Sequence, residues 1–255
     1  MLLFLFCKGG SVMWKKIQFV LFACVLSMVF VSVAATQAEA AAKAAEKPER
    51  IELVLILDKS GSMQGLESDT IGGFNSMIEK QKALDVPVRV TTVLFNDKTD
   101  VLYESRNIGA VKPLTDKEYE VGGTTALLDA VGSTILNVER EPVVKTKGTK
   151  VIFVIITDGM ENASTEFTKP KVKQMISDKQ EKAGWDFVYL GANIDAAEEA
   201  GAIGVDRANA VTYRNTESGV RANYDAVSAF VEEAAAPSTA EKGLWRSRVE
   251  TDTSK

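Results

Sequence analysis

The sequence predicts an α/β fold in which a doubly wound, mostly parallel sheet has helices on both faces. Apolar stretches of strand length alternate with amphipathic stretches of helix length, which favours an open sheet with crossing helices. Residues 151–156 are apolar at every position. A strand without a polar side is buried on both faces, as in a parallel sheet between two helix layers. We therefore expect one domain over residues 51–235.

Each expected element follows from a local pattern. Apolar runs predict strands at residues 52–57, 88–95, 101–104, 151–156, 185–190 and 208–213. Amphipathic windows between these runs predict helices at residues 69–83, 126–139, 171–183 and 220–234. The run 101–104 is short, and we expect it to form an antiparallel edge strand. In the run 185–190, Phe187 and Tyr189 alternate with Val188 and Leu190, which is typical of a buried strand.

The first 40 residues are typical of a secretory signal peptide. A start at Met13 places the basic pair Lys15-Lys16 ahead of the apolar stretch 17–35, and a small-residue pattern ends at Ala40, after which we expect cleavage. The product would be secreted or extracytoplasmic. The apolar stretch is also close to the length that crosses a bilayer as a helix. An anchor formed by uncleaved residues 17–35 is therefore the alternative.

Two segments flank the expected domain. Residues 41–50 are rich in alanine, which is typical of a semi-rigid spacer. Residues 236–255 form a polar C-terminal tail, and we expect this tail to be loosely ordered.

Composition excludes several functions. The chain has 255 residues and no histidine, and its two cysteines are Cys7 and Cys24. A Ser-His-Asp triad is therefore excluded, and a chain cleaved after Ala40 has no disulfide. Removing residues 1–40 takes away three lysines and one glutamate, which changes the formal net charge from −5 to −7. An acidic domain without a basic stripe is a poor nucleic-acid binder, so we expect no nucleic-acid partner.

Polar side chains follow two of the apolar strands at the point where each strand ends. Asp58-Lys59-Ser60-Gly61-Ser62 follows the first strand, and Thr157-Asp158-Gly159 follows the strand 151–156. Between them in the chain lies Gly122-Gly123-Thr124-Thr125. Ligands of doubly wound sheets bind outside the carboxyl ends of the strands. We therefore expect these three segments to converge on one site.

The donor atoms at this edge indicate a divalent cation. Carboxylate and hydroxyl oxygens are hard ligands that suit Mg²⁺, Mn²⁺ or Ca²⁺, whereas zinc prefers nitrogen and sulfur. Each segment also has a structural explanation on its own: Ser60 or Ser62 would cap a helix, Thr124 or Thr125 would cap the helix after it, and Asp158-Gly159 would form a turn. Three such segments in this order at strand ends favour a metal site over these separate roles.

The pattern Asp58-Lys59-Ser60-Gly61-Ser62, followed by a distant Thr and then Asp158, resembles the metal-ion-dependent adhesion site of von Willebrand factor A domains. Further stretches resemble a bacterial branch of that family, and the resemblance covers about residues 51–235. These stretches are Gly73-Phe74-Asn75, Leu94-Phe95-Asn96-Asp97, Thr125-Ala126-Leu127-Leu128-Asp129-Ala130 and Tyr189-Leu190-Gly191-Ala192-Asn193. One departure is Met160, because members of the family often carry an acidic residue after Thr-Asp-Gly.

The resemblance implies which residues would hold the ion. Ser60, Ser62 and Thr125 would offer hydroxyl oxygens, and Asp58 and Asp158 would bind directly or through water. Thr125 is preferred to Thr124 because Ala126-Leu127-Leu128-Asp129 then follows the threonine at the same spacing as in the family. The cofactor would be Mg²⁺, or else Mn²⁺ or Ca²⁺.

The same resemblance implies the function. A partner protein's Asp or Glu would complete the octahedron that Mg²⁺ demands, which makes the chain a protein-binding module of the cell envelope or the extracellular space and not an enzyme. Two alternatives stay open. One is a metal-dependent hydrolase such as a phosphatase, although Ser60 stands where a second acid usually serves as general acid. The other is a structural envelope component with a vestigial metal site.

Overall fold

The computed structural model describes residues 47–237 and 243–249, and these residues contain one six-stranded sheet. The strand order is β3-β2-β1-β4-β5-β6, in which β3 is antiparallel to β2 and all other neighbours are parallel. This arrangement confirms the predicted fold class. The strands are β1 (Arg50–Asp58), β2 (Val88–Phe95), β3 (Thr99–Asn107), β4 (Thr149–Thr157), β5 (Asp186–Ala192) and β6 (Ala210–Tyr213).

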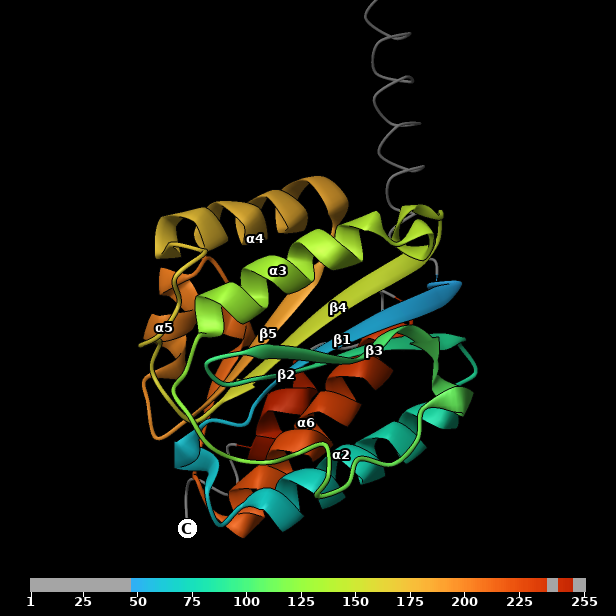
Figure 1. The fold of residues 1–255 in the computed structure, drawn as a ribbon. Coiled ribbons are helices and arrows are strands. Elements are labelled where there is room, and N and C mark those ends of the chain that lie inside the picture. Colours follow the sequence, from blue (N-terminus) through green and yellow to red (C-terminus); the bar gives the residue numbers. More distant parts are fainter. Residues whose placement is uncertain (1–46, 238–242, 250–255) are drawn as a thin grey trace, which may run out of the picture. The chain divides into compact units, whose positions relative to one another are not determined.

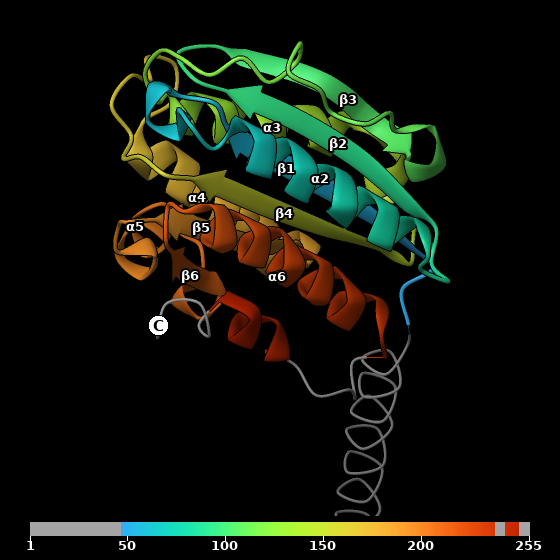
Figure 2. The same ribbon diagram turned by 90° about the horizontal axis from the view of Figure 1, so that it is seen from below.

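Helices cover both faces of the sheet (Figure 1). Helices α2 and α6 lie side by side on one face, as seen in Figure 2, and α3 and α4 lie on the other. The helices are α2 (Glu67–Lys82), α3 (Leu127–Arg140), α4 (Lys169–Ala183), α5 (Ala196–Ala202) and α6 (Glu217–Ala235). Single 3₁₀ turns are η1 (Gly61–Met63), η2 (Ile108–Ala110), η3 (Pro142–Lys145), η4 (Arg207–Asn209) and η5 (Leu244–Arg246).

Alternation along β1 explains why the sheet is buried on both sides. Leu53 and Leu55 belong to the core on the α2/α6 face, whereas Val54 and Ile56 belong to the core on the α3/α4 face. Successive side chains of a strand point to opposite faces, so a run without polar residues supplies both cores at once. The central strands are thereby fixed, and the positions of their carboxyl ends with them.

Two elements differ from the sequence-based expectation. Strand β3 is longer than the predicted 101–104, because pairing with β2 extends it over polar, mostly exposed residues that carry no apolar pattern. Helix α5 was not predicted, since it consists of small and acidic residues. The carboxylate of Asp195 caps it by accepting a hydrogen bond from the Glu198 backbone N–H at 2.9 Å.

The C-terminal segment 243–249 packs against α6, so the expectation of a loosely ordered tail is wrong for these residues. Trp245 is only 2% exposed and meets the Phe230 ring edge-on, with ring centroids 5.3 Å apart. The Glu233 carboxylate accepts hydrogen bonds from the backbone N–H groups of Gly243 and Trp245, at 2.8 and 2.7 Å. One aromatic anchor and one acceptor for two backbone donors hold this segment in place.

Other expectations concern residues beyond the described part of the chain. The signal peptide 1–40, its alternative as a membrane anchor, and residues 41–46 of the spacer lie outside the described residues. Among residues 47–237 and 243–249, no helix combines the length and the apolar character needed to span a membrane.

A glycine sets the distance between α2 and α6. A Cβ atom added at Gly73 would lie 2.3 Å from a ring carbon of Tyr224 on α6, whereas a Cβ at the neighbouring Gly72 would meet nothing within 4 Å. The two adjacent glycines therefore differ: Gly73 permits close helix packing, and Gly72 faces open space.

A buried carboxylate, that of Glu52, links β1, β2 and β3 near the start of β1, at the other end of that strand from Asp58. Glu52 on β1 is fully buried and accepts hydrogen bonds from the hydroxyls of Thr91 at 2.9 Å and Ser105 at 2.7 Å. The Ser105 hydroxyl also accepts a hydrogen bond from Arg89 Nε at 2.9 Å. Burial is the main cause that raises the pKa of Glu52 above its ordinary value of 4.5, although both hydroxyls oppose the shift.

We predict that Gly73→Ala lowers the free energy of unfolding by about 1–3 kcal/mol, because the new methyl group must displace the Tyr224 ring. The control Gly72→Ala should be neutral or stabilise by up to about 1 kcal/mol, because alanine favours helix and the position is open. Urea unfolding of the two variants measures this difference. Equal effects of the two substitutions would contradict the packing role of Gly73.

We predict that Glu52→Gln removes a pH dependence of stability. A carboxyl group whose pKa is raised on folding stabilises the native state below its unfolded pKa, and this stabilisation is lost as pH rises through the folded pKa. The wild-type protein should therefore lose stability relative to Glu52→Gln as pH increases from about 4.5 upward. Urea unfolding at several pH values tests this. Parallel pH profiles would show that Glu52 does not titrate differently in the folded state.

Candidate metal centre

Three loops meet at the carboxyl edge of the central strands. Because β1 and β4 are paired neighbours with Leu57 opposite Ile156, the loops that follow them start side by side. The loop around Gly122-Gly123 joins them through two backbone hydrogen bonds: Gly122 N–H to the Lys59 carbonyl at 2.9 Å, and Gly61 N–H to the Gly123 carbonyl at 3.1 Å. The predicted convergence of the three segments is thus present in the backbone.

Asp58 is the innermost group of this edge and is only 1% exposed. Its Oδ1 accepts the Ser60 backbone N–H at 2.7 Å, and its Oδ2 accepts the Thr157 hydroxyl at 2.6 Å. The Tyr119 hydroxyl donates to the Asp58 carbonyl oxygen at 2.5 Å. These bonds fix both the carboxylate and the strand end that carries it.

Asp158 and the two serines form one hydrogen-bonded group. The Ser62 hydroxyl donates to Asp158 Oδ1 at 2.6 Å, and the Ser60 and Ser62 hydroxyl oxygens lie 3.1 Å apart. Asp158 is 8% exposed, Ser60 is buried and Ser62 is exposed. The open side of the group is therefore the side on which Ser62 lies.

Thr125 lies in the same crevice, next to Gly159. A Cβ atom built at Gly159 would lie 3.2 Å from the Thr125 hydroxyl oxygen and 3.6 Å from the Ser62 hydroxyl oxygen. Thr125 is 3% exposed, whereas Thr124 is exposed. The structure thus brings Asp58, Ser60, Ser62, Thr125 and Asp158 together and leaves Thr124 outside the group.

The helix-capping roles considered for the serines and threonines find no support in the hydrogen bonds, whereas Asp158-Gly159 does form a bend, in which the Thr157 hydroxyl donates to the Gly159 carbonyl at 3.1 Å. Ser60 precedes the turn η1 without a side-chain cap, and α3 is preceded by Ala126, again without a side-chain cap. The Ser62 hydroxyl is used by Asp158 instead of by a helix end. The hydroxyl groups therefore point to a shared centre.

The electrostatics of the crevice favour a cation. Burial raises the pKa of Asp58 and that of Asp158, and the nearby Asp158 raises the pKa of Asp58 further. The hydrogen-bond partners of the two carboxylates are the Ser62 and Thr157 hydroxyls, the Ser60 backbone N–H and the side-chain amide of Asn215, none of which carries a positive charge. The nearby Lys59 ammonium pairs with Asp100 at 2.7 Å. A divalent ion would stabilise two buried carboxylates in this setting.

The donor set fits a hard cation. It consists of two carboxylates and three hydroxyls, all oxygen ligands of the kind that Mg²⁺, Mn²⁺ and Ca²⁺ take. Within the described residues, no three His, Cys, Asp or Glu side chains gather around a point. A site here would therefore depend on its hydroxyl oxygens.

Two acidic residues to which the sequence reasoning gave no role hold the loop after β4 against α3. Glu161 accepts the backbone N–H groups of Leu128 and Ala163, each at 2.9 Å, and Asp129 accepts those of Thr165 and Phe167, each at 2.8 Å. The expected acidic position after Thr-Asp-Gly is instead Met160, which is 60% exposed. Glu161, at the next position, accepts hydrogen bonds from backbone N–H groups.

Two asparagines were also missed. The Asn162 side-chain oxygen accepts the Thr125 backbone N–H at 2.9 Å, and the Asn162 backbone N–H donates to the Thr125 carbonyl at 3.0 Å. Asn215, in the turn between β6 and α6, donates from Nδ2 to Asp158 Oδ2 at 3.1 Å. Asparagine in a predicted loop is a weak signal, since turns favour it for local reasons.

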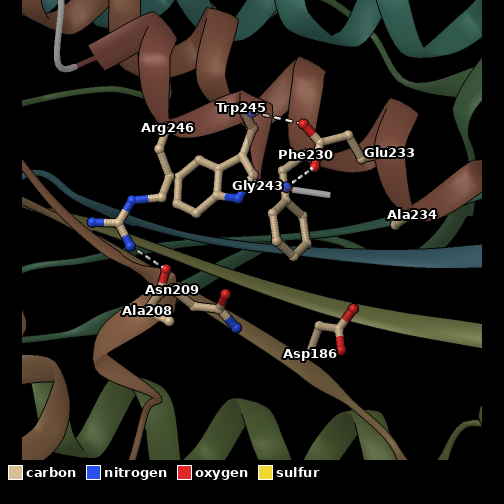
Figure 3. A pocket seen from close by; sticks show the side chains of 9 residues that line it. All are labelled: Asp186, Ala208, Asn209, Phe230, Glu233, Ala234, Gly243, Trp245 and Arg246. Atoms are coloured by element: carbon tan, nitrogen blue, oxygen red, sulfur yellow. Dashed lines mark hydrogen bonds between the residues drawn. The ribbon is translucent and has the colours of Figure 1, made fainter. Parts of the chain in front are cut away.

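A separate pocket of about 370 Å³ lies near the starts of β5 and β6, beside the C-terminal segment (Figure 3). Its charged groups already have partners: Asp186 pairs with Lys150 at 2.7 Å, Glu233 accepts hydrogen bonds from two backbone N–H groups, and Arg246 donates to the Ala208 carbonyl. These contacts are those of a packed segment, so this pocket does not compete with the crevice as the functional site.

The sequence matches no family model, and no curated protein matches it. Solved structures do resemble it. The pilus adhesin SpaC from Lactobacillus rhamnosus GG has a TM-score of 0.57 at 12% identity, over 74% of this chain and 30% of that chain. A von Willebrand factor type A protein from Catenulispora acidiphila has a TM-score of 0.50 at 14% identity, over 72% and 42%.

A third structure is proximal thread matrix protein 1 from the mussel byssus, with a zinc-occupied MIDAS motif. It has a TM-score of 0.50 at 15% identity, over 75% of this chain and 46% of that chain. This chain thus corresponds to less than half the length of each of the three proteins. At such low identity the likeness concerns the fold, and the chain has the fold of von Willebrand factor A domains.

Proposed function

We propose that this protein is a divalent-metal-dependent protein-binding module that ligates an acidic side chain of a partner. The observation that carries the proposal is the pair of buried carboxylates, Asp58 and Asp158, that share a crevice with three hydroxyls and have no cationic partner among the contacts described above. Such a group is costly to bury unless an ion compensates it.

The residues of the chain would have distinct roles in this site. Ser60, Ser62 and Thr125 would offer hydroxyl oxygens, and the carboxylates would hold the ion directly or through water. The Ser60 N–H and the Thr157 hydroxyl keep Asp58 in one orientation, so little rearrangement is needed on binding. When bound, Mg²⁺ supplies an electrophilic position that a partner's carboxylate can fill.

The comparisons support the proposal by analogy. One structural relative is a pilus adhesin, and in another the MIDAS motif is occupied by zinc. The zinc was found in that protein, so Zn²⁺ should also be tested as a competitor in any metal titration of this chain. We propose Mg²⁺, or else Mn²⁺ or Ca²⁺, because the five candidate ligands offer only oxygen.

The environment of the protein is part of the proposal. Signal cleavage after Ala40 would release the domain into an extracytoplasmic space, and an uncleaved helix 17–35 would tether it to the membrane. In either case the domain would meet partner proteins outside the cytoplasm, where relatives with the same fold include an adhesin.

We predict that Mg²⁺ or Mn²⁺ raises the melting temperature of the wild-type protein and that Ser60→Ala abolishes the rise, because one oxygen ligand is lost. An ion at one hundred times its dissociation constant stabilises a protein by about 2.7 kcal/mol, which corresponds to several degrees for a domain of this size. Melting curves in EDTA and with each of Mg²⁺, Mn²⁺, Ca²⁺ and Zn²⁺ measure this.

Ser133→Ala is the matched control for this titration. Ser133 lies on α3 and donates its hydroxyl to the Asp129 carbonyl at 2.6 Å, away from the crevice. This variant should keep the full response to metal. No response of the wild-type protein at millimolar ion would favour a vestigial site and a purely structural role.

We predict that a partner captured from envelope extract in the presence of Mg²⁺ is released by EDTA, and that Asp158→Ala captures none. Both treatments remove the position that the partner's carboxylate would occupy. Pull-down with the wild-type domain, with Asp158→Ala and with Ser133→Ala as control measures this. Capture that persists fully in chelator would refute the metal-dependent mode of binding.

The enzyme alternative has its own outcome. Hydrolysis of a phosphate ester that requires magnesium and disappears in Asp58→Asn would replace the binding module by a phosphatase. The chain's lack of histidine and the presence of Ser60 where a second acid would stand argue against that result.

A further inference from the structure

Asn215 places one amide group against the candidate metal centre from a part of the chain that the motif does not include. It lies in the turn between β6 and α6, and its Nδ2 donates to Asp158 Oδ2 at 3.1 Å, across 57 positions of sequence. Its Oδ1 is buried and has no hydrogen-bond partner in the described part of the chain. The NH₂ group of this amide therefore has a hydrogen-bond partner, whereas its carbonyl oxygen has none among the described residues.

The turn that carries Asn215 is tightly built. The Thr216 N–H donates to the Arg214 carbonyl at 2.8 Å, and the Thr216 hydroxyl caps α6 by accepting the Gly219 N–H at 3.2 Å. A Cβ atom at Gly219 would lie 2.1 Å from the Arg214 carbonyl oxygen, so this position requires glycine. The Asn215 side chain is thus presented to Asp158 by a constrained backbone.

The orientation of the amide follows from charge. A carboxylate accepts hydrogen bonds only, so the NH₂ group of Asn215 must face Asp158 and the carbonyl oxygen must point away from it. A buried acceptor without a donor costs about 1–3 kcal/mol. A water molecule held by a cation in the crevice is a strong donor and would satisfy this oxygen.

We propose that Asn215 is a further residue of the metal centre, a positioning residue that orients Asp158 through its N–H and accepts a hydrogen bond from the hydration shell of the ion through its amide oxygen. This inference rests on the proposed metal-dependent function. Together with Ser62, which donates to the other oxygen of Asp158 at 2.6 Å, Asn215 would fix both oxygens of this carboxylate. Partners of this kind around metal ligands typically contribute 10–100-fold to metal affinity.

The test is the binding of Mn²⁺ alone, measured by titration calorimetry and by counting free Mn²⁺ with electron paramagnetic resonance. Asn215→Ala should weaken Mn²⁺ binding about 10–100-fold. Asn209→Ala is the matched control, because Asn209 is also half-buried but precedes β6 at the opposite end of that strand. The control should bind Mn²⁺ like the wild type.

Asn215→Asp keeps the shape of the side chain but replaces the donor by a third carboxylate. In EDTA this variant should melt below Asn215→Ala, because like charges then face each other, and Mn²⁺ should raise its melting temperature by more than it raises that of the wild type. Because Mn²⁺ would restore its stability, this variant tests the inference in the metal-bound state even if Asn215→Ala fails to fold.

The outcomes separate the two proposals. If wild-type protein binds Mn²⁺ and Asn215→Ala binds it equally well, with only its stability in EDTA reduced, Asn215 is a structural residue and the inference is overturned. An Asn215→Asp variant whose response to Mn²⁺ equals that of the wild type would overturn it as well. If the wild-type protein itself binds no Mn²⁺, the proposed function fails and this inference fails with it.

Discussion

The burial of two carboxylates at the ends of adjacent parallel strands is the constraint on which the rest of the site depends. Asp58 and Asp158 are 1% and 8% exposed, and both have a pKa raised by burial. The fold places them there because β1 and β4 are paired in register and the runs 53–57 and 151–156 that lead to them are apolar on both faces. Removing them from water is unfavourable, so hydroxyl and amide donors surround them, and a divalent ion would complete the compensation.

Polar side chains hold the loops around this pair through hydrogen bonds to backbone groups. Glu161 and Asp129 fix the loop after β4 to the start of α3, and Asn162 exchanges hydrogen bonds with the backbone of Thr125. The three hydroxyl groups therefore sit in a pre-arranged crevice with one exposed side at Ser62. Preorganisation of this kind lowers the cost of binding an ion, because few side chains have to move.

Much of the fold was predictable because alternation and strand length are local signals. The strand at residues 88–95 has the predicted bounds, and the apolar run 151–156 lies within β4. Strand ends pointed to the three segments of the site, the resemblance to von Willebrand factor A domains implied the five candidate ligands, and their role as ligands stays a prediction. Strand β3 was underestimated because an exposed edge strand needs no apolar run, and its length comes from pairing with β2.

Contacts between segments that are distant in the chain could not be predicted from the sequence. Asn215 meets Asp158 only because β6 adds to the sheet beyond β5, and nothing near Asn215 in the chain indicates that partner. Trp245 was likewise assigned to a loose tail, since its burial depends on Phe230 and Glu233 of α6. Side chains that serve tertiary contacts look like ordinary loop residues until the fold is known.

The most direct measurement is a crystal structure of the protein grown with Mn²⁺, in which anomalous scattering locates the ion. The account predicts one anomalous peak in the crevice, at about 2–2.5 Å from oxygen atoms of the serine and threonine hydroxyls or the two carboxylates. Crystals of a chain saturated with Mn²⁺ that show no peak between the loops at residues 58–62, 122–125 and 158–159 would contradict it.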